Sequence, residues 1–497
     1  MSLTLALVSV IAGCGPSRIV YEHRDVLGGQ RDLYLVREDG ANRVVLAASP
    51  DDETACGVTS DRRIVFNRKT SGYLGQIWLV KEDGTGLELS RDIGGPCFGV
   101  TGNDRVIAVD APSIVSFPAD PHKAGGGVLF RPGSGASAMP VAIARDNHVV
   151  VNEENRAQAL HTLWSVSDDG TKRFSLAQVQ GVGLESPFIA VSPHNRVIFR
   201  VPGNYPSGGL FSRATTGGPV TPLTFPKCAF TYPVLKQNDR FCGFTPDGRV
   251  LQTRLCSIKV GSEEHLMGDI FLMNDDGANI VQIKHSPNEL VNQVCLGAIE
   301  GVTKDEKGKD ITVEWVIVGR YSDMDLDQKR PMSVWSYPIS SAGPGARMLG
   351  GISGGSGQTR LTFEGLTPSG RVLLKYRSQT GDSIVSVKPA DAIPKVTLEF
   401  QFPPAQFDYS VTGFTLSDNV IFSKRAIAPA PSAAVTSLQV IASEGLLASQ
   451  GYTSMQPLAD QPVENALSFV FFTDYLHPGF RLGARRCQAC ELPKWRR

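Results

Sequence analysis

A short phrase that ends in Asp-Gly recurs four times along the chain and constrains its fold more than any other feature. In each copy, alternating apolar residues are followed by Asp-Gly and by a second strand-like run. Asp-Gly readily adopts the positive φ angles of tight hairpin turns, so each copy predicts a β-hairpin. The copies span residues 33–43, 77–87, 163–173 and 270–280, with turn aspartates Asp39, Asp83, Asp169 and Asp276. Because hairpins need these aspartates, we expect them to be structural.

The spacing of these turns indicates that the chain is built from repeats. Asp39 and Asp83 lie 44 residues apart, and Asp83 and Asp169 lie 86 apart, which fits a period near 43. A period of this size with hairpins inside it is typical of a β-propeller. The 51 Gly and 32 Pro among 497 residues supply the many turns that such a fold needs.

A second phrase recurs in step with the first. It is a short strand that ends in Thr or Ser, then a turn, then a β-branched strand, and it precedes each Asp-Gly hairpin or a degenerate version of it. The repeating unit is therefore strand A, a turn, strand B, a variable connection, strand C, the Asp-Gly turn and strand D, which is one propeller blade. Copies lie at residues 57–66, 99–108, 190–199, 243–251, 365–374 and 413–422, with weaker ones at 142–151 and 302–318.

The repeats predict an all-β fold, a single propeller of four-stranded blades over residues 14–480. The sequence holds eight A–B turns and nine C–D turns, so we expect eight blades, with nine as the alternative. The first unit, residues 18–48, has no strand A. We expect the strand-like residues 467–472 to supply it, so that N- and C-terminal strands close the ring and leave no exposed sheet edge.

The N-terminus predicts export and a lipid anchor. Residues 3–11 form a continuous apolar run, which is too short for a permanent membrane span but fits the core of a secretory signal, although no Lys or Arg precedes it. Residues 11–14, Ile-Ala-Gly-Cys, resemble the bacterial lipobox. This resemblance implies that residues 1–13 are a signal peptide and that Cys14 is lipidated, and Gly15 favours the outer membrane. The alternative is a buried first strand that contains Cys14.

Cysteine positions support export. Setting Cys14 aside leaves eight of the nine cysteines, an even number. Cys56 and Cys97 precede strand-A phrases of neighbouring units, and so do Cys242 and Cys295. Equivalent strands of adjacent blades lie side by side, so both pairs are predicted disulfides, with buried free thiols as the alternative. The remaining cysteines are Cys228, Cys256, Cys487 and Cys490.

Motifs for catalysis are sparse. Residues 351–355, GISGG, match a nucleophile elbow in letters, but they lie in a Gly/Ser-rich loop without the strand and helix that the motif requires, so Ser353 is not predicted to be catalytic. The eight histidines show no zinc-ligand spacing. Residues 481–497 are predicted to be a basic tail with one CxxC, either frayed or in contact with lipid or a partner.

The connections between strands B and C predict a binding face. They vary in length, and the longest, residues 257–268 and 321–332, belong to adjacent units. Variation confined to one face of a repeat array marks its binding face. We expect a charged patch there, and the alternative is a pair of tolerated surface insertions. The patch comprises Glu263, Glu264, His265, Asp323, Asp325, Asp327, Lys329 and Arg330.

Three residues of this patch form a weak candidate calcium site. Asp323, Asp325 and Asp327 alternate along the chain, and such carboxylates can converge on Ca²⁺, which prefers oxygen ligands. The segment is not an EF-hand, because Gln328 stands where that loop requires Gly. The alternative is a solvated acidic loop. No other cofactor is expected.

The repeats resemble those of the TolB-like propellers, the PD40-type repeats that also occur in prolyl oligopeptidases. The resemblance rests on residues 77–90 (IWLVKEDGTGLELS) and 243–251 (GFTPDGRVL). It implies a propeller in the bacterial cell envelope, facing the periplasm, but neither the N-terminal domain of TolB nor the hydrolase domain of the peptidases is found.

Two functions remain open at this stage. The first is a non-enzymatic lipoprotein whose propeller binds a protein, peptide or glycan. The alternative is a hydrolase or lyase with its site at the central channel. The formal net charge of zero does not favour nucleic acid as a partner, and no oligomeric state is predicted.

Overall fold

The computed structural model describes most of the chain between Arg18 and Ile441, together with two short strands beyond it. The described residues are 18–24, 30–37, 42–69, 75–181, 186–202, 209–223, 234–283, 292–304, 307–321, 333–339, 346–350, 360–367, 370–378, 381–389, 396–401, 407–414, 420–426, 435–441, 456–457 and 463–464. The predicted signal peptide, Cys14, residues 467–472 and the basic tail lie outside them.

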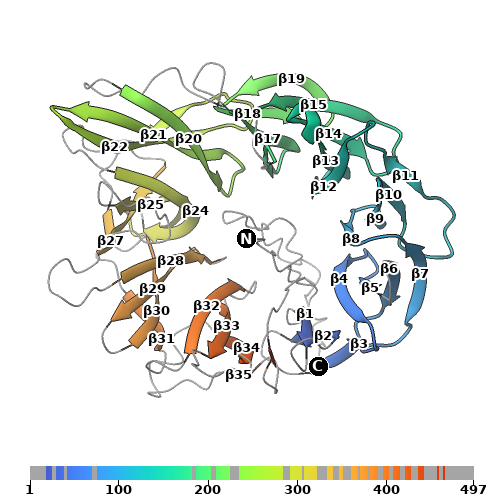
Figure 1. Cartoon of the computed structure of the whole chain (residues 1–497). Helices are drawn as coiled ribbons and strands as arrows, with labels where there is room; N and C mark the ends of the chain where they lie inside the picture. The colour runs from blue at the N-terminus through green and yellow to red at the C-terminus, as the bar shows by residue number, and fades with distance from the viewer. Residues whose placement is uncertain are drawn as a thin grey trace, which may run out of the picture.

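Within the described residues, the strands pair into nine antiparallel sheets, which we number 1 to 9 in chain order. Sheet 1 has three strands and the next seven have four each, and Figure 1 shows the sheets arranged around a common axis. This is the arrangement of a β-propeller, as the repeats predict.

The strand bounds follow the predicted A, B, C, D order. Sheet 1 comprises β1 (Arg18–Arg24), β2 (Arg31–Arg37) and β3 (Val44–Ala47). Sheet 2 comprises β4 (Asp52–Val58), β5 (Ile64–Lys69), β6 (Gly75–Val80) and β7 (Glu88–Ile93). Sheet 3 comprises β8 (Cys97–Val100), β9 (Arg105–Asp110), β10 (Ser113–Pro118) and β11 (Gly127–Phe130). Sheet 4 comprises β12 (Ser137–Ile143), β13 (His148–Asn155), the short 3₁₀ helix η1 (Arg156–Gln158), β14 (Leu160–Ser167) and β15 (Arg173–Gln180).

The later sheets follow the same order. Sheet 5 comprises β16 (Phe188–Val191), β17 (Arg196–Val201), β18 (Gly209–Ala214) and β19 (Gly217–Pro222). Sheet 6 comprises β20 (Val234–Phe244), β21 (Val250–Val260), β22 (Glu263–Met273) and β23 (Val281–Ile283). Sheet 7 comprises β24 (Asn292–Lys304), β25 (Asp310–Tyr321), β26 (Ser333–Pro338) and β27 (Ala346–Gly350). Sheet 8 comprises β28 (Arg360–Leu366), β29 (Val372–Ser378), β30 (Gly381–Val387) and β31 (Val396–Gln401).

Sheet 9 comprises β32 (Phe407–Phe414), β33 (Val420–Ala426), β34 (Val435–Ile441) and β35 (Gln456–Pro457), and β36 (Val463–Glu464) also pairs with β34. The strand β36 lies next to β1 of sheet 1, so the two ends of the described chain meet. Among the described residues, sheet 1 consists of strands B, C and D, which agrees with the prediction that the first unit has no strand A of its own.

The core is built between neighbouring sheets. One buried apolar cluster joins Leu33 and Leu35 of sheet 1 to Ile64 and Phe66 of sheet 2. Similar clusters join each consecutive pair of sheets as far as sheet 8. Burial of apolar area between sheets contributes roughly 25 cal/mol per Å², so each sheet is stabilised by its neighbours rather than by itself.

Local residues set both kinds of turn. In the A–B turn of sheet 2, Thr59 N donates to Arg63 O at 2.9 Å, Thr59 Oγ1 accepts from Arg63 N at 3.0 Å, and Arg62 has a φ of 67°. The same backbone bond recurs in sheets 3, 4, 5, 6 and 8. In the C–D turn of sheet 2, Thr85 N donates to Asp83 Oδ1 at 2.9 Å while Gly84 takes a φ of 79°. The turn prediction is therefore confirmed at Asp83, and Asp39 lies outside the described residues.

One predicted connection is wrong. Residues 257–268 were expected to form a variable loop between strands B and C of sheet 6. The structure instead continues β21 and β22 through this segment as a regular hairpin, with Ser257 opposite Leu266 and Val260 opposite Glu263. Gly261, with a φ of 63°, makes the tight turn at its tip.

Candidate binding cleft

The structure describes only part of the charged patch predicted on the B–C face. Glu263, Glu264 and His265 lie at the start of β22, where His265 Nε2 is 3.7 Å from Glu263 Oε2 and Ser257 Oγ donates to Glu264. The other members, Asp323, Asp325, Asp327, Lys329 and Arg330, lie outside the described residues. The patch and its candidate calcium site therefore remain predictions.

Both predicted disulfides are present. Cys56 of β4 is bonded to Cys97 of β8, with a Cα–Cα distance of 5.8 Å, and Cys242 of β20 is bonded to Cys295 of β24, at 5.9 Å. Each bond joins the A strands of neighbouring sheets, as the repeat register predicts. Cys256 is also disulfide-bonded. Disulfides persist in oxidising compartments, so these bonds indicate an exported protein.

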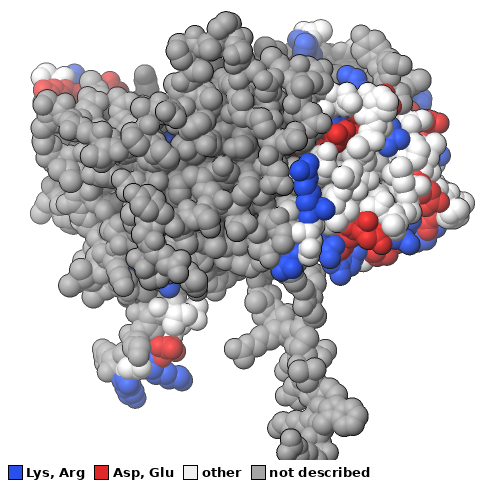
Figure 2. Space-filling view, turned by 90° about the horizontal axis from the view of Figure 1, so that it is seen from below, with Lys and Arg blue, Asp and Glu red and all other residues white. Residues whose placement is uncertain are grey.

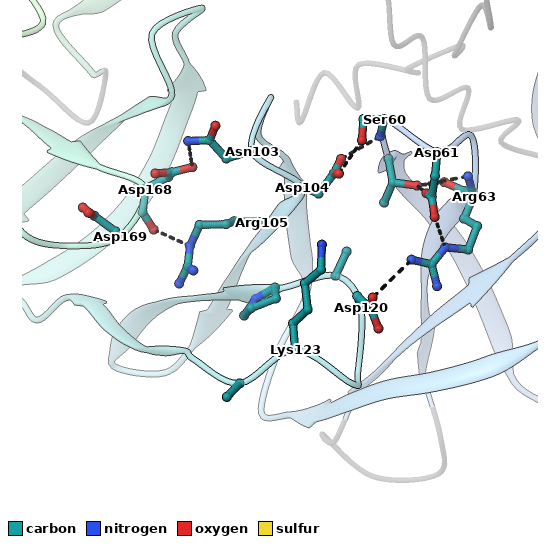
Figure 3. A pocket seen from close by; sticks show the side chains of 14 residues that line it. Ser60, Asp61, Arg63, Asn103, Asp104, Arg105, Asp120, Lys123, Asp168 and Asp169 are labelled. Carbon is teal, nitrogen blue, oxygen red and sulfur yellow. Dashed lines mark hydrogen bonds and ion pairs between the residues drawn. The ribbon is translucent and has the colours of Figure 1, made fainter.

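A polar cleft of about 440 Å³ opens on the face that carries the A–B and C–D turns, opposite the face predicted from sequence. It is formed by the A–B turns of sheets 2 and 3, the C–D connection of sheet 3 and the C–D turn of sheet 4, and Figure 3 shows these side chains around it. Its volume lies in the range of small-ligand pockets. On the part of the described surface that Figure 2 shows, acidic and basic side chains are intermixed.

Two carboxylates of the cleft, those of Asp104 and Asp168, are held by neutral donors. Asp104 accepts from Ser60 N at 2.6 Å and from the Ser60 hydroxyl. Asp168 Oδ2 accepts from Thr101 Oγ1 at 2.8 Å and from Asn103 Nδ2 at 3.1 Å. These bonds cross between sheets, because Asp104 and Thr101 belong to sheet 3, Ser60 to sheet 2 and Asp168 to sheet 4. They fix the carboxylates in place without cancelling their charge.

Asp169, the turn aspartate beside Asp168, is held in the same way. Its Oδ1 accepts from Thr171 N at 3.0 Å, from Thr171 Oγ1 at 2.8 Å and from Ser167 Oγ at 2.6 Å. These hydrogen bonds lower the pKa of Asp169 to about 2. The carboxylate therefore stays ionised at neutral pH.

The two arginines of the cleft have protein partners. Arg63 Nε donates to Asp61 Oδ2 at 2.8 Å, and its guanidinium also approaches Asp120 at 4.0 Å. Arg105 Nε donates to Ser116 Oγ at 2.8 Å and to the carbonyl oxygen of Asp168 at 3.0 Å. Lys123 differs from both, because its exposed side chain extends into the open centre of the cleft.

Two carboxyl groups of the cleft, those of Asp61 and Asp169, have lowered pKa values. Burial of Asp61 alone would raise its pKa, but the hydrogen bond from Thr59 and the charge of Arg63 outweigh burial and lower it. Asp169 is lowered as well. A general acid at neutral pH needs a raised pKa, and neither of these shifts is in that direction.

Two aspartates that directly precede turn aspartates, Asp168 and Asp275, have an inter-sheet role that the sequence pattern did not predict. In sheet 6, Asp275 Oδ2 accepts from Ser192 Oγ and lies 3.2 Å from His194 Nδ1, and Arg196 Nε donates to the carbonyl oxygen of Asp275 at 2.9 Å. Asp168 makes equivalent contacts in sheet 4. The signal was the doublet Asp-Asp-Gly, because the turn itself needs only the second aspartate. The first fastens its sheet to the preceding one.

Neither a membrane-spanning helix nor a metal-binding group is found among the described residues. None of their helices is long and apolar enough to cross a membrane. No group of three or more His, Cys, Asp or Glu side chains among them is arranged to hold a metal ion.

No known protein-family profile and no curated protein sequence matches the chain. Among solved structures it is similar to TolB from Acinetobacter baumannii, at 13% identity and a TM-score of 0.30, over 52% of this chain and 61% of the TolB chain. It therefore covers less than two thirds of that TolB structure. It is also similar to an oligogalacturonate lyase from Vibrio parahaemolyticus, at 10% identity and a TM-score of 0.31, over 79% and 95% of the two chains. A post-proline cleaving enzyme from Rickettsia typhi matches at 10% identity and a TM-score of 0.33, over 66% and 59%.

Proposed function

We propose that this protein is an exported, non-enzymatic binding protein of the bacterial cell envelope, whose propeller holds a protein or peptide partner at the polar cleft. The observation that carries this proposal is the cleft itself. In this cleft Asp104 and Asp168 are fixed by cross-sheet hydrogen bonds from Ser60, Thr101 and Asn103, which suits recognition by a rigid surface. The two disulfides support export.

The scaffold of this proposal is a closed ring of nine blades. Nine sheets among the described residues, and the position of β36 beside β1, support nine rather than the eight expected first. Closure would protect the edge of sheet 1, which has no strand A.

The proposed anchor is a lipid on Cys14, which would hold the propeller at the outer membrane and facing the periplasm. Its support is the lipobox-like phrase at residues 11–14. One acyl chain alone gives only marginal membrane binding, whereas the several chains of a lipidated N-terminus give stable anchoring.

A capture experiment tests binding against catalysis. The tagged protein is expressed in its native envelope, recovered with what co-purifies, and compared with Asp104→Asn, which weakens the carboxylate surface of the cleft. We expect a defined partner that is retained intact by the wild type and depleted in the variant. Cleavage of that partner during incubation with the wild-type protein would favour the hydrolase or lyase alternative instead.

A further inference from the structure

We propose that the cleft recognises a cationic peptide segment, one that presents Lys or Arg side chains, rather than an anionic or neutral ligand. This inference rests on the proposed function and adds the chemistry of the partner. It is argued from the charges of the cleft, the state of each charged group and the lining of the walls.

The first step is the balance of charge. Five carboxylates line the cleft, against three basic side chains. Two of those three, Arg63 and Arg105, already donate to protein oxygen atoms. The cleft therefore carries a formal excess of two negative charges, and most of its basic groups are engaged by the fold.

The second step is the state of Asp168. Its side chain is only 5% exposed, yet it lines the cleft. Its carboxylate hydrogen bonds from Thr101 and Asn103 both end on Oδ2 and come from a hydroxyl and an amide. A buried carboxylate that has only neutral donors gains most from a cationic partner, because charge-assisted hydrogen bonds are the stronger kind.

The third step is the neighbouring carboxylates. Asp104 and Asp169 likewise accept hydrogen bonds from neutral donors. Together with Asp168 they add three carboxylates to the lining of the cleft, and guanidinium and ammonium groups form charge-assisted hydrogen bonds with such acceptors.

The fourth step excludes other ligands. No metal-holding group occurs among the described residues. None of the described lining residues is aromatic, so the cleft offers no ring face for a sugar. An anion would have to rely on Lys123, since the arginines are engaged.

Lys123 allows the sign of the ligand's charge to be tested. Its ammonium lies among the carboxylates (Figure 3), where it would repel a basic side chain and attract an acidic one. Replacement of Lys123 by Gln should therefore strengthen the binding of a cationic peptide, whereas loss of Asp168 should weaken it.

The experiment measures fluorescence anisotropy of labelled hexalysine with the purified full chain, alongside hexaglutamate and a neutral Gly-Ser peptide. Asp168→Asn should lower hexalysine affinity by roughly tenfold or more. Its matched control, Asp275→Asn, removes a carboxylate with the same cross-sheet role outside this cleft and should leave the affinity within about twofold. Lys123→Gln should raise the affinity by roughly threefold.

Three results would overturn the inference: tighter binding of hexaglutamate than of hexalysine, weaker hexalysine binding by Lys123→Gln, or equal losses in Asp168→Asn and Asp275→Asn. Tight binding of neutral maltoheptaose with no response to hexalysine would do the same. Lys123→Gln alters an exposed residue, so its result stands even if Asp168→Asn lowers stability. If hexalysine fails to bind while the envelope partner is still captured through Asp104, the inference is wrong and the proposed function stands.

Discussion

Two buried glutamates, Glu22 of sheet 1 and Glu53 of sheet 2, should make stability depend on pH. Glu22 Oε2 of β1 accepts from Arg31 at 3.3 Å, and its carboxylate also accepts from the backbone of Ala55 in β4. Glu53 of β4 accepts from Arg68 Nε at 3.1 Å. Burial outweighs these partners and raises the pKa of each glutamate to about 7.

The sign of the pH effect follows from these values. The folded protein binds the two protons more tightly than the unfolded chain does, so the stabilising contribution is complete below about pH 4.5 and is lost as the pH rises towards 7. Glu22→Gln should reduce this loss of unfolding free energy with rising pH, by no more than about 3 kcal/mol. Thermal unfolding midpoints measured from about pH 4 to about pH 8 test this dependence of stability on pH. Glu263→Gln, which changes an exposed side chain, is the control. A wild-type slope in Glu22→Gln would contradict this account.

At the scale of elements, the sequence was sufficient for the turns but not for the B–C hairpin of sheet 6. The turns are specified locally, by Thr59 or Asp83 acting on backbone groups two to four residues away. This B–C connection was expected to be a loop because it is longer than those of the first units. The extra residues instead lengthen β21 and β22, and Glu263, Glu264 and His265 lie near the tip of the hairpin.

The same contrast explains why the cleft was not predicted. Its residues come from sheets 2, 3 and 4, and the donors that fix Asp168 lie more than 60 residues earlier in the chain. No local pattern marks such a site. Only the doublet that precedes each turn glycine offered a signal.

A glycine pair tests whether C–D turns pack against the preceding sheet. Gly277 has a φ of 79°, and a Cβ there would lie 2.9 Å from Thr221 Cγ2 and 3.1 Å from Pro222 O of sheet 5. Gly308 has a φ of 77° with open space around it. Alanine at either position strains the backbone by about 1 kcal/mol. Gly277→Ala should therefore lower the free energy of unfolding more than Gly308→Ala, because only the Cβ at position 277 meets close contacts in sheet 5. Equal losses in chemical denaturation would argue against tight packing at this turn.

The disulfides give a second prediction at this scale. Replacing Cys242 and Cys295 by Ser should lower the free energy of unfolding by about 2–4 kcal/mol, because the bond closes a long loop in the unfolded chain. Chemical denaturation of the double variant measures the loss, and reduction of the wild type, which also opens the Cys56–Cys97 bond, should cost at least as much. No change on reduction would mean that these cysteines are not bonded in the native protein.

At the scale of the whole molecule, the repeat determines the architecture because each sheet is incomplete without its neighbours. The apolar clusters that join consecutive sheets are the physical reason that a period near 43 residues arranges the sheets around a common axis (Figure 1). Function is not encoded in that period. It depends on side chains that vary from one unit to the next, such as Lys123 and Asp168.

The lipid anchor is a prediction at this scale. Cys14→Ser should move the protein from the membrane fraction to the soluble fraction of the envelope, because the thiol that would carry the lipid is gone. Fractionation with mass spectrometry of the N-terminus measures both position and processing. A soluble wild-type protein that retains Met1 would refute the anchor.

The two faces of the ring can also be compared directly. Reversing the charges of Asp323, Asp325 and Asp327 tests the B–C patch, and Asp168→Asn tests the cleft on the opposite face. If the cleft is the binding site, charge reversal leaves partner affinity close to that of the wild type. A loss confined to the charge-reversed variant, with unchanged thermal unfolding, would place the site on the B–C face instead.

The most direct test of the central claim is the affinity of the captured envelope partner for three forms of the full chain: wild type, Asp168→Asn and Asp275→Asn. The two variants remove equivalent inter-sheet carboxylates, and only Asp168 lines the cleft. Surface plasmon resonance should show a loss of roughly tenfold or more for Asp168→Asn and near wild-type affinity for Asp275→Asn. Equal affinities for all three forms, or equal losses in both variants, would contradict the assignment of binding to this cleft.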